Sequence, residues 1–180
     1  ARARIARLFG KFTKNNNLVL HNFSKNIDTL DDVRKILGEV MIDRLEVLEY
    51  DLTEEHQNRI MDLCRNHAIS HVHISVRQLS VRKINAFIIK LTRMGVTVDI
   101  FDISGFNSFE HQSLDKSLWQ ELQRDLRAQQ VTMTVKSMDD PSFNRLDYDE
   151  GVKLHIRCKK TGNQDDFSPL RSRGFTFNWN

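Results

Sequence analysis

The sequence repeats a unit of one amphipathic helix followed by one short strand, and this repeat constrains the fold more than any other feature. The expected strands are centred on Val19, Val47, His73, Asp99 and Met133, so the unit returns about every 26 residues, with a longer last step. Such repeats are typical of stacked arrays, in which one unit cannot bury its apolar face alone and its neighbours complete the core. The repeat therefore predicts one continuous array.

Length and composition agree with a single folded unit. The chain has 180 residues, 39% of them hydrophobic, and a formal net charge of only +3, which is enough for one packed core and too little charge to indicate nucleic acid by itself. We expect one domain over 1–180, made of a leading helix in 1–17, helix-strand repeats in 18–136 and a β-rich C-terminal cap in 137–180. The start at Ala1 leaves open that another module, such as an F-box, precedes it.

The local patterns place the elements along the chain. Alternation of apolar residues predicts strands at 18–23, 45–52, 70–77, 96–103, 131–136, 152–159 and 175–179. Helical spacing predicts helices at 4–14 and 29–41, one capped by Thr53, one from Ser80 to Gly95, and one that uses Leu118, Trp119, Leu122 and Leu126. A loop at 104–113 accounts for the longer last step.

Only one face of the expected sheet is apolar. In the strand at 70–77, Val72, Ile74 and Val76 point one way, whereas the histidines His71 and His73 point the other way. A doubly wound α/β fold buries both sheet faces, and its strands read as nearly continuous apolar runs. We therefore predict an α/β fold with helices on one face of a mostly parallel sheet, curved into a leucine-rich-repeat-like arc. The asparagine signature of standard leucine-rich repeats is absent.

The polar face of this sheet is the predicted binding surface. It would display His71, His73, Arg77, Thr97, Asp99, Phe101, Thr132, Thr134 and Lys136. A rigid concave surface of this kind suits another protein better than a metabolite. Phe101 either anchors the partner or contacts a loop that contains Phe106 and Phe109, and the sequence leaves both readings open.

A family resemblance extends this reading. A basic amphipathic leading helix followed by divergent helix-strand units, such as those around 43–48 and 69–74, resembles the leucine-rich-repeat-like region of nematode F-box-associated proteins. The resemblance covers about residues 5–136 and contains no diagnostic motif, so no individual residue role is carried over. It implies a non-enzymatic, intracellular adaptor that binds the substrate of a ubiquitin ligase.

Two other functions remain open alternatives. Basic residues gather in the C-terminal third, and Lys153, Arg157, Lys159 and Lys160 lie near the aromatic residues of 175–179. Cations with stacking aromatics favour single-stranded RNA, although the same residues can also form the rim and the underside of the cap. An α/β enzyme is the third possibility.

The sequence gives little support for a metal site, a reactive thiol or a bound cofactor. The pair His71 and His73 suits a metal only if His21 or His155 joins it, and exposed histidines are the simpler reading. Cys64 and Cys158 lack metal or redox spacing and are expected to be free, buried thiols, with a disulfide as the alternative. No phosphate-binding glycine loop occurs. We therefore expect no metal, no small-molecule cofactor, no membrane segment and no enzyme activity.

Overall fold

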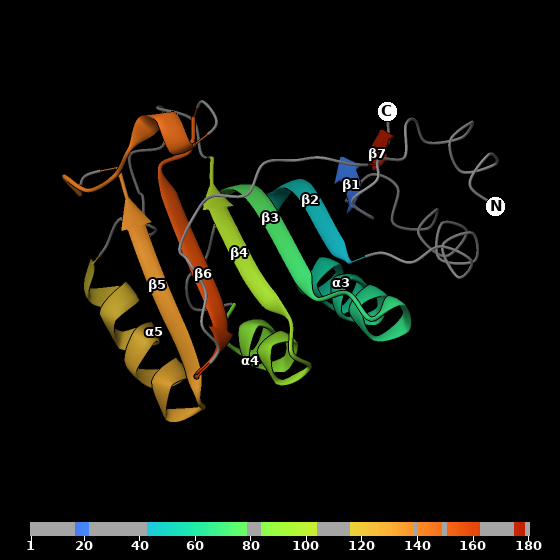
Figure 1. The fold of residues 1–180 in the computed structure, drawn as a ribbon, viewed down its shortest axis with the longest axis horizontal. Helices are drawn as coiled ribbons and strands as arrows, with labels where there is room; N and C mark the ends of the chain where they lie inside the picture. Colours follow the sequence, from blue (N-terminus) through green and yellow to red (C-terminus); the bar gives the residue numbers. More distant parts are fainter. Residues whose placement is uncertain are drawn as a thin grey trace.

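Seven strands form one mixed sheet. The computed structural model describes residues 17–21, 43–78, 84–103, 116–138, 140–148, 151–162 and 175–178. The strands are β1 (Asn17–His21), β2 (Arg44–Asp51), β3 (His71–Gln78), β4 (Thr97–Asp102), β5 (Val131–Ser137), β6 (Leu154–Lys160) and β7 (Phe175–Asn178). They lie side by side in the order β5-β6-β4-β3-β2-β1-β7 (Figure 1).

The sheet is parallel except at one strand. The pairings from β1 through β4 are parallel, and β7 pairs in parallel with β1. Strand β6 lies between β4 and β5 and runs antiparallel to both. Because β6 has neighbours on both sides, it is an interior strand of the sheet.

The described helices cover one face of the sheet. They are α3 (Glu54–His67), α4 (Asn85–Arg93) and α5 (Lys116–Ala128), and a short 3-10 helix, η4 (Arg145–Asp147), precedes β6. The parallel strands β2, β3, β4 and β5 advance across the sheet in one direction, so right-handed crossovers place all three helices on the same side. Helix α4 contacts both α3 and α5, and together they form one layer (Figure 1).

The core lies between this helix layer and the apolar sheet face. Its most deeply buried side chains include Leu45, Val72, Ile74, Val98, Ile100 and Ile156 from strands and Ile60, Phe87, Leu91 and Leu126 from helices. The strand members are cross-strand partners, for example Val72 with Val98 and Ile100 with Ile156. The period-two pattern in the sequence thus becomes one continuous apolar layer.

The helix ends repeat a common geometry. Thr53 accepts a hydrogen bond from the backbone of His56, and the His56 ring accepts one from the backbone of Thr53, which forms a reciprocal cap at the start of α3. After each of α3, α4 and α5 the backbone turns through a residue with positive φ, namely Ala68, Gly95 and Gln130. Glycine adopts this conformation most readily, so Ala68 and Gln130 are both unexpected there.

The structure confirms the α/β class and the mostly parallel sheet, and the described strands lie within two residues of their predicted positions. A leucine-rich-repeat-like arc is not shown. One prediction is wrong: the strand expected in the C-terminal cap is β6, which inserts into the sheet beside β4. The predicted helices at 4–14 and 29–41, the Ser80 cap and the loop at 104–113 lie outside the described residues.

Truncation of the α4 aromatic core residue tests this packing. Phe87 is 1% exposed, so Phe87→Ala should lower the free energy of unfolding by about 3–5 kcal/mol, because it leaves a cavity between α4 and the sheet. Urea unfolding followed by circular dichroism measures the change. The matched control is Leu146→Ala, since Leu146 is 82% exposed and its truncation should change stability by less than about 0.5 kcal/mol. Equal effects of the two variants would contradict the described core.

Candidate functional site

Polar side chains from four adjacent strands meet on the sheet face opposite the helices. Strand register aligns them in rows, so that Glu46 lies beside His73, His73 beside Asp99, and Asp99 beside Arg157. One row further along, Phe101 lies beside His155. We call the set made of Arg44, Glu46, His71, His73, Asp99, Phe101, Tyr148, His155 and Arg157 the Asp99 network.

Asp99 is the centre of this network and is fully buried. One carboxylate oxygen, Oδ1, accepts hydrogen bonds from His155 Nε2 at 2.6 Å and from Arg157 Nε at 2.7 Å. The other, Oδ2, accepts from Arg157 Nη2 at 3.2 Å and from His71 Nε2. These four bonds match the hydrogen-bonding capacity of a carboxylate, and the two from Arg157 form a bidentate ion pair.

These bonds keep Asp99 ionised. Burial acts to raise its pKa, but the hydrogen bonds from His155, His71 and Arg157 outweigh burial and hold the pKa well below the usual range. A carboxylate that stays charged in the interior requires such partners, because an unpaired buried charge is strongly unfavourable.

His155 connects Asp99 to Tyr148. Its Nε2–H donates to Asp99, and its Nδ1 lies 3.1 Å from the Tyr148 hydroxyl, which donates to it. This pattern assigns a neutral imidazole. The pKa values agree, since burial lowers the pKa of His155, and burial together with the nearby Asp147 raises the pKa of Tyr148 to about 12.

His73 forms a second neutral imidazole at the other side of Asp99. Its Nδ1 accepts a hydrogen bond from Arg44 Nη2 at 2.8 Å, and Arg44 also pairs with Glu46 at 2.8 Å. Burial, followed by the positive charge of Arg44, lowers the pKa of His73 to about 3. His73 is therefore a neutral hydrogen-bond acceptor at physiological pH.

Phe101 fills the space between the two imidazoles. Its ring stacks on His73 at a centroid distance of 4.2 Å and on His155 at 4.1 Å, and its edge contacts Tyr148 at 6.4 Å. Phe101 is only 3% exposed. A buried ring offers a partner little surface to contact. The two readings of Phe101, as a partner anchor or as a contact of the loop with Phe106 and Phe109, stay predictions, since that loop lies outside the described residues.

His71 lies at the edge of the network. Its side chain is 20% exposed, whereas the Asp99 side chain that binds it is not exposed at all. Because Nε2–H donates to Asp99, Nδ1 is the nitrogen that keeps its lone pair in the neutral ring. Register places Thr97 on one side of His71 and Arg44 on the other. Among the network histidines, His71 is thus the most exposed, with 20% against 11% for the side chain of His73.

The predicted partner-binding residues divide into two groups. His71, His73, Asp99 and Phe101 come together in the network, and all except His71 are buried. Arg77, Thr132 and Thr134 are exposed, whereas Thr97 and Lys136 are partly buried. Strand β6 separates the β5 members from the rest, so the nine residues do not form one open surface.

The predicted nucleic-acid residues do not form one basic surface either. Arg157 and Lys153 are buried, Lys159 is partly buried, and Lys160 is exposed. Arg157 uses its charge on Asp99, and alternation along β6 points Lys160 to the face opposite Arg157.

The cysteine prediction is confirmed. Cys64 and Cys158 are both free and buried. Burial raises the pKa of both thiols, that of Cys64 to about 12, so neither is a reactive thiolate. Within the described part of the chain, no three metal-ligating side chains are grouped as a metal site, and no helix there is both long and apolar enough to cross a bilayer.

Sequence reasoning missed several network members. Arg44, Glu46 and Tyr148 were not singled out, and Arg157 was assigned to nucleic acid. A signal was present in β6, where His155 and Arg157 alternate with Leu154, Ile156 and Cys158. A buried His and Arg on the second face of a strand need an acid opposite, and of the two acidic residues in β4, Asp99 is the one in register with Arg157.

Comparisons with known proteins give only distant structural matches. No family model and no curated protein matches the sequence. Among solved structures, a precorrin-6y C5,15-methyltransferase from Geobacter metallireducens is 9% identical, with 89% of this chain and 86% of that chain covered and a TM-score of 0.32. A candidate methyltransferase from Haloferax volcanii, in complex with the Trm112 methyltransferase activator, is 10% identical, with 91% and 89% covered and a TM-score of 0.34. One from Thermoplasma acidophilum is 10% identical, with 81% and 68% covered and a TM-score of 0.30.

These matches correct two predictions. The three structures named above are methyltransferases or candidate methyltransferases, which contradicts two expectations: the absence of enzyme activity, and the assignment to a non-enzymatic recognition module, F-box-type or RNA-binding. The buried network independently removes the docking surface on which the adaptor prediction depended. At these TM-scores the similarity gives this chain no activity, substrate or partner. The resemblance to F-box-associated proteins stays a prediction.

Removal of the central carboxylate tests the network. Asp99→Ala leaves the Arg157 guanidinium buried without its ion-pair partner, and we expect the free energy of unfolding to fall by about 3–5 kcal/mol. The control is Asp62→Ala, which removes an exposed ion pair with Arg65 and should cost no more than about 1 kcal/mol. Chemical unfolding of both variants measures the difference, and a loss at Asp99 as small as at Asp62 would contradict the network.

Acid should weaken the fold through His73. The unfolded chain gains a proton at His73 below about pH 6.5, whereas the folded chain does not until about pH 3. The unfolded state therefore binds more protons in this window, and stability falls as the pH is lowered, by about 1.4 kcal/mol per pH unit for this one group. His73→Gln keeps an acceptor for Arg44 and should remove this share of the slope between pH 6 and pH 4. Unfolding titrations at several pH values test it, with His67→Gln as control, and an unchanged slope in His73→Gln would refute the assignment.

Proposed function

We propose that the chain is an enzyme that uses acid-base catalysis at the edge of the Asp99 network, with His71 as the general base. The observation that carries the proposal is the hydrogen bond from His71 Nε2 to the buried, ionised Asp99. A carboxylate behind an imidazole fixes its tautomer and orientation and stabilises the imidazolium that forms when the ring takes up a proton.

The chemistry follows from this pair. With Nε2–H committed to Asp99, His71 would accept a proton at Nδ1 from a water molecule or a substrate hydroxyl. Asp99 would keep its own charge throughout, since four hydrogen bonds hold it in the ionised form. Removal of such a proton initiates hydrolysis or group transfer, and a positioned base of this kind accelerates it by about 10²–10⁴-fold.

A purely structural role would not need an accessible histidine. Arg157 and His155 already give Asp99 three hydrogen bonds in the interior. His71 adds a fourth from the rim, where its side chain is 20% exposed. Clusters of titratable groups with displaced pKa values and a solvent-accessible member are a recognised mark of active sites.

The sheet topology favours this face over the ends of the strands. Ligands of open α/β sheets bind where consecutive parallel strands depart in opposite directions. From β1 to β5 the strand positions advance in one direction only. Strands β1 to β5 therefore provide no such crevice, and the Asp99 network is the better candidate.

Substitution of the base tests the proposal. Purified protein would be screened against chromogenic carboxylic esters, phosphate esters and glycosides, and the best turnover would be compared with that of His71→Gln. Loss of a general base should lower kcat by about 10²–10⁴-fold with little change in KM. Retention of full turnover in His71→Gln would refute the proposal.

Two controls separate catalysis from stability. His67→Gln removes a histidine at the end of α3, outside the network, and should leave kcat unchanged. The unfolding free energy of His71→Gln would be measured alongside, because a structural role predicts that lost activity recovers at lower temperature together with the folded fraction. A general base predicts that activity stays low in fully folded protein.

A further inference from the structure

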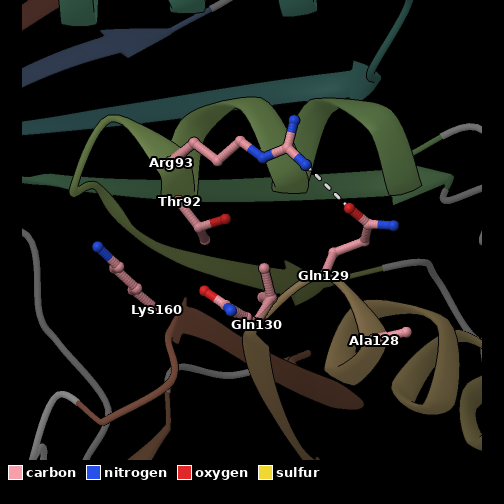
Figure 2. Close-up of a pocket in the computed structure, with 7 residues that line it drawn as sticks. Thr92, Arg93, Ala128, Gln129, Gln130 and Lys160 are labelled. Carbon is pink, nitrogen blue, oxygen red and sulfur yellow. Dashed lines mark hydrogen bonds between the residues drawn. The ribbon is translucent and has the colours of Figure 1, made fainter.

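A polar pocket lies on the helix side of the sheet, away from the Asp99 network. It has a volume of about 340 Å³ and is lined by Thr92, Arg93, Ala128, Gln129, Gln130, Val131 and Lys160. Three segments meet there: the end of α4, the turn from α5 into β5, and the end of β6 (Figure 2). Its size lies at the lower end of the range for small-molecule sites and exceeds the space needed by a single phosphate ion.

The lining is cationic and rich in amides. Arg93 and Lys160 each bring a positive charge, and none of the described residues that line the pocket is acidic. Both cations are on the surface, so a ligand can reach them from solvent. An arginine fork pairs with two oxygens of a carboxylate or a phosphate at once, whereas a lysine acts as a point charge.

Arg93 is held in position across the pocket. Its Nη2 donates to Gln129 Oε1 at 2.8 Å, which joins α4 to the α5–β5 turn (Figure 2). Within the described part of the chain this bond uses one guanidinium N–H group of Arg93, and the guanidinium has further N–H donors. An oriented side chain loses less freedom when a ligand binds, and binding is correspondingly tighter.

Gln130 contributes a carboxamide to the pocket wall. Its φ is +63°, in the left-handed region, at the turn where the equivalent positions are Gly95 after α4 and Ala68 after α3. Because glycine and alanine have no side-chain donor or acceptor, the carboxamide is the feature that distinguishes the turn at the pocket.

We propose that this pocket binds a small phosphorylated polyol of the size of a sugar phosphate. Arg93 and Lys160 would bind the phosphate oxygens, and the carboxamides of Gln129 and Gln130 would bind hydroxyl groups, for which they supply both donors and acceptors. This site does not include His71, so a negative result for ligand binding here would leave the proposed catalysis unaffected, and the reverse also holds.

Calorimetric titration with ribose 5-phosphate tests the proposal, with ribose and inorganic phosphate as separate probes. Ribose 5-phosphate should bind at least tenfold more tightly than inorganic phosphate, and ribose should not bind measurably. Arg93→Gln and Lys160→Gln should each weaken binding of ribose 5-phosphate by at least tenfold. Equal affinity for inorganic phosphate would overturn the sugar phosphate, and no binding by any probe would overturn the site.

Two further variants make the test specific. Arg124→Gln removes an equal charge from an exposed position on α5 outside the pocket, and it should leave binding unchanged. Gln130→Gly should weaken binding while it raises the melting temperature, because it removes the amide and relieves the positive φ. Weakening by Arg124→Gln equal to that by Arg93→Gln, or full binding in Gln130→Gly, would contradict the assignment.

Discussion

The buried carboxylate of Asp99 is the interaction on which the polar half of the molecule depends. Burial of one charge requires a matching set of donors, and the fold brings them to β4 from two other strands: Arg157 and His155 from β6 and His71 from β3. Their hydrogen bonds hold β6 against β4 in one register, since a shift of one residue would point these side chains into the apolar core. Buried ion pairs add little net stability compared with apolar packing, but they penalise alternative arrangements strongly. The network thus helps to hold the antiparallel strand β6, which is second from one edge, in an otherwise parallel sheet.

The burial of Asp99 and its partners also limits what the polar face of the sheet can bind. A surface that binds a partner by docking must expose its anchors, whereas here the aromatic ring of Phe101 is enclosed by His73 and His155. Enclosure lowers the effective dielectric constant, which strengthens each hydrogen bond and displaces the pKa values of the groups involved. The result is that two neutral imidazoles, those of His73 and His155, lie near the ionised Asp99, and the His71 side chain at the edge of the network is 20% exposed. This arrangement is suited to moving a proton, and poorly suited to binding a broad protein surface.

Much of the fold follows from local patterns in the sequence. The alternation of Val72, Ile74 and Val76 gives the strand and its apolar face, and Thr53 and Gly95 give helix ends, because each of these signals acts within a few residues. The place of β6 does not follow in this way. Its alternating pattern defines a strand, but pairing with β4 joins residues more than 50 positions apart, for example His155 with Asp99, and no local rule fixes that choice. Of the candidate site, His71, His73 and Asp99 were found from strand alternation, whereas Arg44 and Tyr148 required the register and the chain path.

The two polar sites of the molecule differ in a way that bears on function. In the Asp99 network nearly every donor and acceptor is satisfied within the protein, so the network holds its shape without a ligand and leaves one nitrogen of His71 to act. In the pocket at the end of α4, by contrast, Arg93 has one internal partner and Lys160 is exposed, so charge and hydrogen-bonding capacity remain for a ligand. Polar groups that are already hydrogen-bonded within the protein fix the geometry of a site, whereas polar groups with remaining hydrogen-bonding capacity can bind a ligand. The helix-strand repeat provides both sites. Its helices end and its parallel strands begin at the same end of the sheet, where the pocket lies. The buried charges lie on the sheet face opposite the helices.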